Sequence, residues 1–179
     1  MTKWNKFLDE KEGQQHDFSS TQINLPKNLA KEIIIWGREQ LPDSFLYQAE
    51  GREDEIHVTV LYGLKDEQPN QVKEILEKQK QIKFKLGKIS LFDTNEEYDV
   101  VKIEVESPGL HKLHKLLKAL PHQDSHPKYN PHVTIAYVKK GKAKRIVGNS
   151  HFEGEIILGK EVIFSSFNGE KTKIALKRD

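Results

Sequence analysis

Two short segments of the sequence carry residue types suited to acid–base chemistry at phosphorus. His57-Val58-Thr59-Val60 and His132-Val133-Thr134-Ile135 share one pattern, and their histidines are 75 residues apart (132 minus 57). Because side chains alternate between the faces of a β-strand, each segment would present an imidazole and a hydroxyl on one face and two aliphatic side chains on the other. We therefore expect two His/Thr pairs held on rigid strands.

A pair of imidazoles can run proton transfer in both directions near neutral pH. With an unperturbed pKa of about 6.5, one imidazole can accept a proton from an attacking hydroxyl while the other donates one to a leaving oxygen. Threonine hydroxyls can donate hydrogen bonds to the non-bridging oxygens of a phosphate. The pattern predicts phosphodiester cleavage without a metal or other cofactor, with His57 and His132 as the acid–base pair and Thr59 and Thr134 as phosphate ligands.

The elements that must position these residues follow from the periodicity of apolar residues. Three amphipathic helices are predicted over 26–41, 71–81 and 108–120, the last opened by Ser107-Pro108. The predicted strands cover 18–25, 56–63, 83–92, 98–106, 131–138, 152–158, 161–167 and 172–176. The mixture indicates an α+β chain.

The order of these elements repeats. Strand, helix, loop and strand occur twice, and each copy ends in one of the two histidine motifs. Two lobes related by a pseudo-two-fold axis would bring both motifs into one cleft. We expect residues 17–179 to form this one domain and residues 1–16 to form an N-terminal extension.

Composition removes other kinds of chemistry. The chain has 179 residues, no cysteine and a net charge of +2 (29 minus 27), with 36% hydrophobic and 31% charged residues. Thiol nucleophiles, disulfides and cysteine metal sites are excluded. No apolar run reaches the length of a membrane helix and no secretory leader is visible, which predicts a soluble cytoplasmic protein. No obligate protein partner is evident from the sequence.

The two motifs, the second preceded by Pro131, resemble those of the 2H phosphoesterase superfamily, which includes the LigT-like 2′-5′ RNA ligases and cyclic phosphodiesterases. The resemblance extends over residues 18–176. It implies a bilobal, pseudo-two-fold α+β fold, with antiparallel sheets lining a central cleft and helices outside. It also implies that one histidine is the general base and the other the general acid, without saying which. The stretch 89–107 together with 131–137 is similar to LigT-type domains encoded by bacteriophages.

The substrate class stays open between two forms. A 2′,3′-cyclic phosphate on a nucleotide or RNA end would suit the motifs, and so would a cyclic (oligo)nucleotide. The alternatives are a phage counter-defence enzyme that degrades a host cyclic nucleotide signal and a non-catalytic module that binds one. A metal site that adds His122 and His126 to His132 is a further alternative, although no helical histidine pair presents them.

Several flanking residues could assist the motifs. Tyr129 and Asn130 precede the second strand and are candidates for substrate contact. Strict alternation would place Tyr62 and Tyr137 on the core face, which favours packing over base stacking. His111 and His114 flank a leucine stripe, which predicts surface positions.

Overall fold

The computed structural model describes residues 16–123 and 128–179. The helices in this part of the chain are α2 (Lys27–Gln40), α3 (Asn70–Leu76) and α4 (Pro108–Leu117), with short 3-10 turns η1 (Asp43–Phe45) and η2 (Lys144–Ile146). The strands are β1 (Ser19–Asn24), β2 (His57–Leu64), β3 (Ile82–Phe92), β4 (Tyr98–Glu106), β5 (His132–Lys139), β6 (Ile156–Gly159), β7 (Glu161–Ser165) and β8 (Lys171–Ala175).

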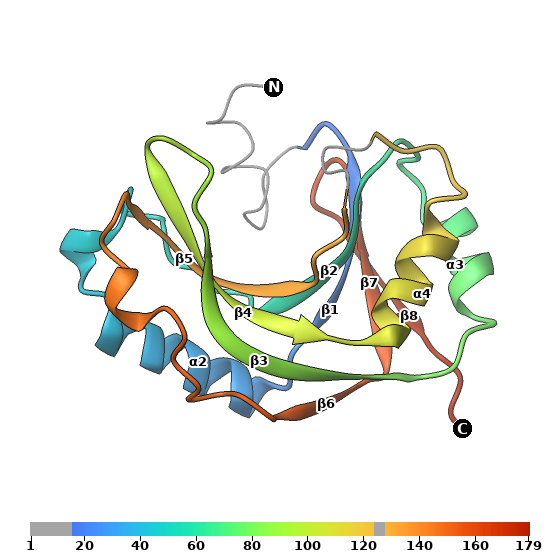
Figure 1. Cartoon of the computed structure of the whole chain (residues 1–179). Coiled ribbons are helices and arrows are strands. Elements are labelled where there is room, and N and C mark those ends of the chain that lie inside the picture. The colour runs from blue at the N-terminus through green and yellow to red at the C-terminus, as the bar shows by residue number, and fades with distance from the viewer. Residues whose placement is uncertain (1–15, 124–127) are drawn as a thin grey trace.

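All eight strands belong to one antiparallel sheet in the order β6-β3-β4-β5-β2-β1-β7-β8. The two motif strands, β2 and β5, are neighbours at its centre. Consecutive strands β6 and β7 lie towards opposite edges of this order, yet a single residue separates them in the chain. The sheet therefore curls into a half-barrel rather than lying flat (Figure 1).

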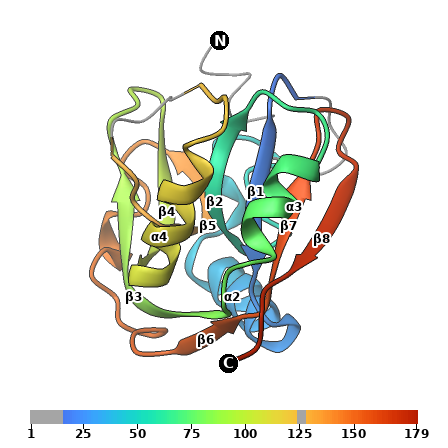
Figure 2. The ribbon, with the colours of Figure 1, turned by 90° about the vertical axis from the view of Figure 1, so that its right-hand side faces the viewer.

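Helices cover one face of this sheet. Ile33 and Trp36 of α2 are buried in the same core as Leu110, Leu113 and Leu117 of α4. Figure 2 shows α3 and α4 side by side on the outside of the sheet, and the two helices are in contact. We call the opposite sheet face, which these helices do not cover, the open face.

The start of α4 shows how the sequence sets a helix boundary. The Ser107 hydroxyl accepts a hydrogen bond from the backbone N–H of Leu110 at 3.0 Å, and Pro108 follows in the first turn, where its missing N–H costs nothing. The Ser107 hydroxyl also donates to the Lys83 carbonyl at 2.7 Å, which fixes the helix start against β3.

The predicted bilobal α+β fold is confirmed, with the strands of both lobes joined in one sheet. Helix α3 ends at Leu76 rather than at the predicted residue 81. The reason is a pairing with the C-terminal segment: the Gln81 N–H donates to the Lys177 carbonyl and the Lys177 N–H donates to the Gln79 carbonyl, both at 2.8 Å. Except for His16, the predicted extension lies outside the described residues. Among those described, no helix has the length and apolar character needed to cross a membrane.

Candidate active site

The two motifs meet at the centre of the sheet. Val58 of β2 pairs with Val133 of β5 in antiparallel register, and both side chains are fully buried. One step away on either side, this register sets His57 opposite Thr134 and Thr59 opposite His132. Residues that flank a buried pair point to the other face, so all four motif side chains share the open face.

The neighbouring strands extend this arrangement into two polar rows across the open face. On the outer side of β2, Asn24 pairs with His57 and Gln22 with Thr59. On the outer side of β5, Glu104 pairs with His132 and Lys102 with Thr134. The rows across β1, β2, β5 and β4 are therefore Asn24, His57, Thr134, Lys102 and Gln22, Thr59, His132, Glu104.

Both imidazoles are oriented by the same main-chain contact. Nδ1 of His57 lies 2.6 Å from the Glu55 carbonyl oxygen, and Nδ1 of His132 lies 2.7 Å from the Asn130 carbonyl oxygen. Because a carbonyl oxygen only accepts, each Nδ1 must carry the hydrogen. Nε2 of each ring is then the atom left for proton exchange with a substrate.

Each motif strand carries one extra residue directly after its threonine. Thr21 and Gln22 of β1 pair with Leu61 and Thr59, which leaves Val60 as the additional residue of a β-bulge. Val101 and Lys102 of β4 pair with Ala136 and Thr134, which leaves Ile135 as its counterpart in β5. A bulge shifts the alternation of all later residues in its strand by one.

The bulges overturn the prediction for Tyr62 and Tyr137, because that prediction assumed strict alternation. Tyr62 pairs with Ser20 and Tyr137 with Val100, and both therefore lie on the open face. Tyr137 packs there against Tyr98, in a small cluster separate from the main core. Tyr62 is half-buried and contacts Phe18 edge to face, with ring centroids 6.2 Å apart.

Two helices on the covered face, α2 and α4, contact the bulge residues directly. A Cβ atom added at Gly37 of α2 would lie 2.8 Å from Cγ2 of Ile135, so only glycine allows this approach of helix to strand. On the other lobe, Nδ1 of His114 donates to the Val60 carbonyl at 2.7 Å. The prediction of a plain surface position for His114 is therefore wrong. Its function as a donor depends on a contact 54 residues away, which no local pattern reveals.

Tyr129 supports the first motif from the loop before β5. Its hydroxyl donates to the Thr59 carbonyl at 2.7 Å, and its ring stacks on His114 with centroids 4.0 Å apart. Burial raises the pKa of the Tyr129 phenol, so the group stays protonated. Asn130 is exposed beside it and contributes its carbonyl to His132. Substrate contact by the side chains of Tyr129 and Asn130 remains a proposal.

The surroundings of His132 include a charged pair that sequence reasoning missed. The Lys102 ammonium contacts the Glu104 carboxylate and donates to the Ser90 hydroxyl at 2.6 Å. It also lies 4.4 Å from the centroid of the Phe92 ring, which meets the His132 ring edge to face with centroids 4.8 Å apart. The Lys102 side chain is 5% exposed and that of Glu104 is 48% exposed.

These neighbours set the protonation of the second motif. Burial lowers the pKa of His132 to about 4; the hydrogen bond to the Asn130 carbonyl and the Glu104 carboxylate oppose the shift, while Lys102 and His57 add to it. Burial also opposes ionisation of Glu104, but hydrogen bonds from Lys102 and Ser90 outweigh it and hold the pKa of that carboxyl below its usual value. His132 is therefore neutral and Glu104 is charged at neutral pH.

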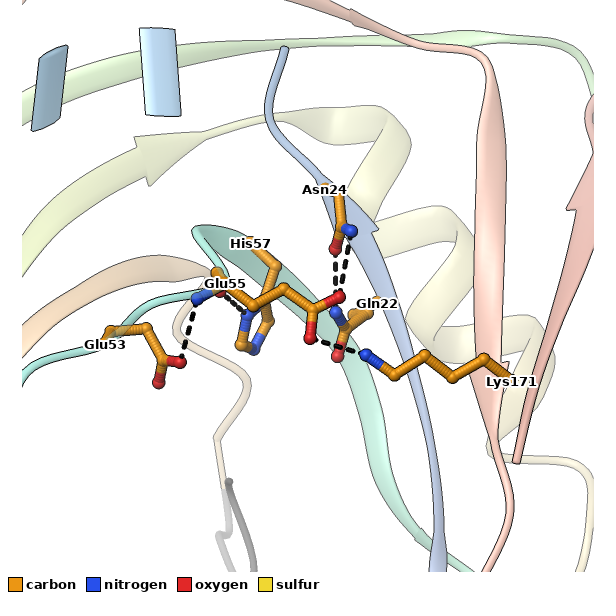
Figure 3. A network of polar contacts seen from close by, with 6 residues as sticks. All are labelled: Gln22, Asn24, Glu53, Glu55, His57 and Lys171. Atoms are coloured by element: carbon orange, nitrogen blue, oxygen red, sulfur yellow. Dashed lines mark hydrogen bonds and ion pairs between the residues drawn. The ribbon is translucent and has the colours of Figure 1, made fainter. Parts of the chain in front are cut away.

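A second charged pair lies beside His57 (Figure 3). The Lys171 ammonium of β8 lies 2.5 Å from the Glu55 carboxylate, which also accepts a hydrogen bond from the Asn24 amide at 3.0 Å. Burial opposes ionisation of Glu55, but the contacts with Lys171 and Asn24 outweigh it and lower the pKa of the carboxyl. Each imidazole thus has an ionised carboxylate and a lysine nearby.

No group of three histidine, aspartate or glutamate side chains that could hold a metal ion occurs within residues 16–123 and 128–179. His126, part of the alternative metal site, lies outside these ranges. His122 donates through Nδ1 to the Leu120 carbonyl at 2.8 Å.

Solved structures of other proteins share this fold. LigT of E. coli in complex with NADP+ is 18% identical and has a TM-score of 0.63, covering 90% of this chain and 95% of LigT. TT0787 of Thermus thermophilus is 14% identical, with a TM-score of 0.63 and coverage of 89% and 95%. Usb1 of Kluyveromyces marxianus is 11% identical, with a TM-score of 0.58 and coverage of 90% and 99%. The fold is that of the 2H phosphoesterases.

The family follows from the sequence itself. Residues 22–173 match the family described as "Anti-CBASS protein Acb1". This match includes both histidine motifs and spans most of the chain, and the chain belongs to this family. No curated protein matches it significantly.

Proposed function

We propose that this chain is a metal-independent phosphodiesterase that hydrolyses a cyclic oligonucleotide by two-histidine general acid–base catalysis, and that it thereby counters a host defence signal. The observation that carries the proposal is the placement of His57, Thr59, His132 and Thr134 on one sheet face, with each histidine opposite a threonine of the other motif. Membership of the anti-CBASS family supports the choice of a cyclic signalling nucleotide.

The geometry suits a phosphodiester bound between the two central strands. The hydroxyls of Thr59 and Thr134 can donate to its non-bridging oxygens and hold phosphorus between the imidazoles. One Nε2 then takes the proton of the attacking hydroxyl as the new P–O bond forms. The other Nε2 gives its proton to the leaving oxygen as the old P–O bond breaks.

Half-buried aromatic side chains on both sides of the motifs support a substrate with a nucleoside on each side of the phosphate. Phe92 of β3 lies beside His132, and Tyr62, further along β2 from the first motif, contacts Phe18 just before β1. Aromatic rings stack on bases without strong sequence preference. A phosphodiester inside a cyclic oligonucleotide has two such nucleosides, whereas a 2′,3′-cyclic mononucleotide has one.

A 2′,3′-cyclic phosphate on an RNA end is the second candidate. Its support is the similarity in fold to LigT, which has been solved with 3′-AMP, and to Usb1, which has been solved with uridine monophosphate. The site chemistry is the same for both substrates, and only the groups around the phosphate differ.

One substrate panel separates these possibilities. The protein is incubated with cyclic di- and trinucleotides and with 2′,3′-cyclic mononucleotides, each with and without excess EDTA, and the products are identified by ³¹P NMR and chromatography. We expect linear products from the cyclic oligonucleotides at a rate that EDTA does not change. Loss of turnover with EDTA and recovery with a divalent metal would support a metallohydrolase. Tight binding of a cyclic oligonucleotide without turnover would support the binding module.

A further inference from the structure

The two halves of the site are alike in their main-chain contacts, but their charged side chains lie at different positions. Both histidines donate through Nδ1 to the carbonyl two residues earlier. In the pseudo-two-fold arrangement, Lys102 of β4 corresponds to the uncharged Gln22 of β1, because each pairs with a motif threonine. The difference places a buried cation on the His132 side of the site.

The charged groups that face His132 come from the two strands beside it. Lys102 and Glu104 project from β4, and His57 projects from β2 across the site. The neighbouring side chains of β3, Ser90 and Phe92, carry no charge. Since Lys102 is almost fully buried and Glu104 is half exposed, water screens the carboxylate more than the ammonium. The net field at His132 is therefore positive.

At His57, in contrast, the neighbouring charge is mainly negative. Glu55 is two residues before His57 in the chain, and its carbonyl accepts the Nδ1 hydrogen bond. The other charged groups near this ring are Glu53, whose carboxylate accepts a hydrogen bond from the Glu55 N–H at 3.4 Å, Lys171 of β8, which binds the Glu55 carboxylate, and His132 across the sheet. The neighbours from β1, Asn24 and Gln22, are uncharged. In Figure 3 the Glu55 carboxylate lies between the His57 ring and the Lys171 ammonium that it binds.

We propose that Lys102 is a positioning residue that favours His132 as the general base and leaves His57 as the general acid. The proposal rests on the proposed function. In this arrangement Nε2 of His132 removes the proton of the attacking water or ribose hydroxyl while the P–O bond to that oxygen forms. Nε2 of His57, as the general acid, gives its proton to the leaving oxygen as the second P–O bond breaks. The protons return to their starting sites through solvent.

Lys102→Met tests this assignment, because methionine keeps the length of the side chain and removes its charge. The pKa of the His132 ring is measured by NMR, with His132→Ala used to identify the signal, and kcat/KM is measured against pH. We expect the ring pKa to rise by up to about one unit, since Lys102 is one of the charges that lower it and neighbouring charges produce shifts of about 1–3 units. The acidic limb of the profile should move to higher pH by a similar amount, while the alkaline limb stays in place.

Lys171→Met is the matched control on the other half of the site. It should leave the acidic limb unchanged and move the alkaline limb to higher pH, because Glu55 loses its counter-charge beside His57. Glu104→Gln should lower the ring pKa of His132, and Lys102→Arg should restore the wild-type profile. A merely structural role of Lys102 would not produce these opposite signs.

Two results would overturn the proposal: an unchanged ring pKa in Lys102→Met, or movement of the alkaline limb in place of the acidic one. The NMR titration needs no substrate. If the protein cleaves none of the nucleotides in the panel, the proposed function fails, and the effect of Lys102 on His132 is still decided by the ring pKa.

Discussion

Acidification should destabilise this protein through His132 before most carboxylates titrate. The folded protein holds the pKa of this ring at about 4, compared with 6.5 for an unperturbed histidine. Above pH 6.5 the His132 ring is neutral in both the folded and the unfolded protein, so its titration does not change the free energy of unfolding. As the pH falls from 6.5 to 4, His132 becomes protonated in the unfolded chain but stays neutral in the folded protein. The free energy of unfolding therefore falls. A shift of this size corresponds to about 3 kcal/mol, which water around the half-buried ring reduces to about 2 kcal/mol.

Urea unfolding of the wild type and of His132→Gln measures this contribution. Glutamine does not titrate, so the difference between the two proteins isolates the ring from other groups. Between about pH 7.5 and pH 4.5, the wild type should lose about 2 kcal/mol more of its unfolding free energy than the variant. Parallel pH dependence in the two proteins would refute the description of His132 as a half-buried imidazole that is kept neutral.

Three further changes test other parts of the structure. Thr59→Val and Thr134→Val should each lower kcat by about 10²-fold through loss of a phosphate donor, with little change in thermal stability, as measured by steady-state kinetics. Gly37→Val should destabilise the fold by about 1–3 kcal/mol, because its Cβ would overlap Ile135, whereas Ile35→Ala at an exposed position of the same helix should change the unfolding free energy much less. Tyr129→Phe should cost about 1 kcal/mol of stability through loss of the bond to the Thr59 carbonyl, measured by urea unfolding.

Local patterns predicted the elements that carry the site. The alternation of His57-Val58-Thr59 and His132-Val133-Thr134 identified two strands with their polar side chains on one face, and the repeat of strand, helix and strand indicated that the two belong together. Ser107-Pro108 marked the start of α4, because hydroxyl capping and a proline in the first turn depend only on adjacent residues. Such features are encoded within a few residues and need no knowledge of the fold.

Features that depend on pairing between distant strands were missed. The bulges at Val60 and Ile135 arise from register with β1 and β4, and they turn Tyr62 and Tyr137 to the open face against simple alternation. The Lys171–Glu55 contact joins residues 116 positions apart. Lys102 and Glu104 are close in sequence, but only the pairing of β4 with β5 brings them beside the second motif. One local indication of this pair exists in the sequence: Lys102 is a charged residue between Val101 and Ile103, in a strand that is otherwise apolar at that point.

Single-turnover cleavage of a cyclic dinucleotide by His57→Ala, His132→Ala and the double variant tests the central claim of two-histidine catalysis most directly. Because the two imidazoles act in one step, each single variant should lose about 10³-fold or more in rate, and the double variant should be little slower than either. All three variants should unfold cooperatively, and this result would show that they keep the fold. A single variant that retains activity within about tenfold of the wild type would contradict the two-histidine mechanism.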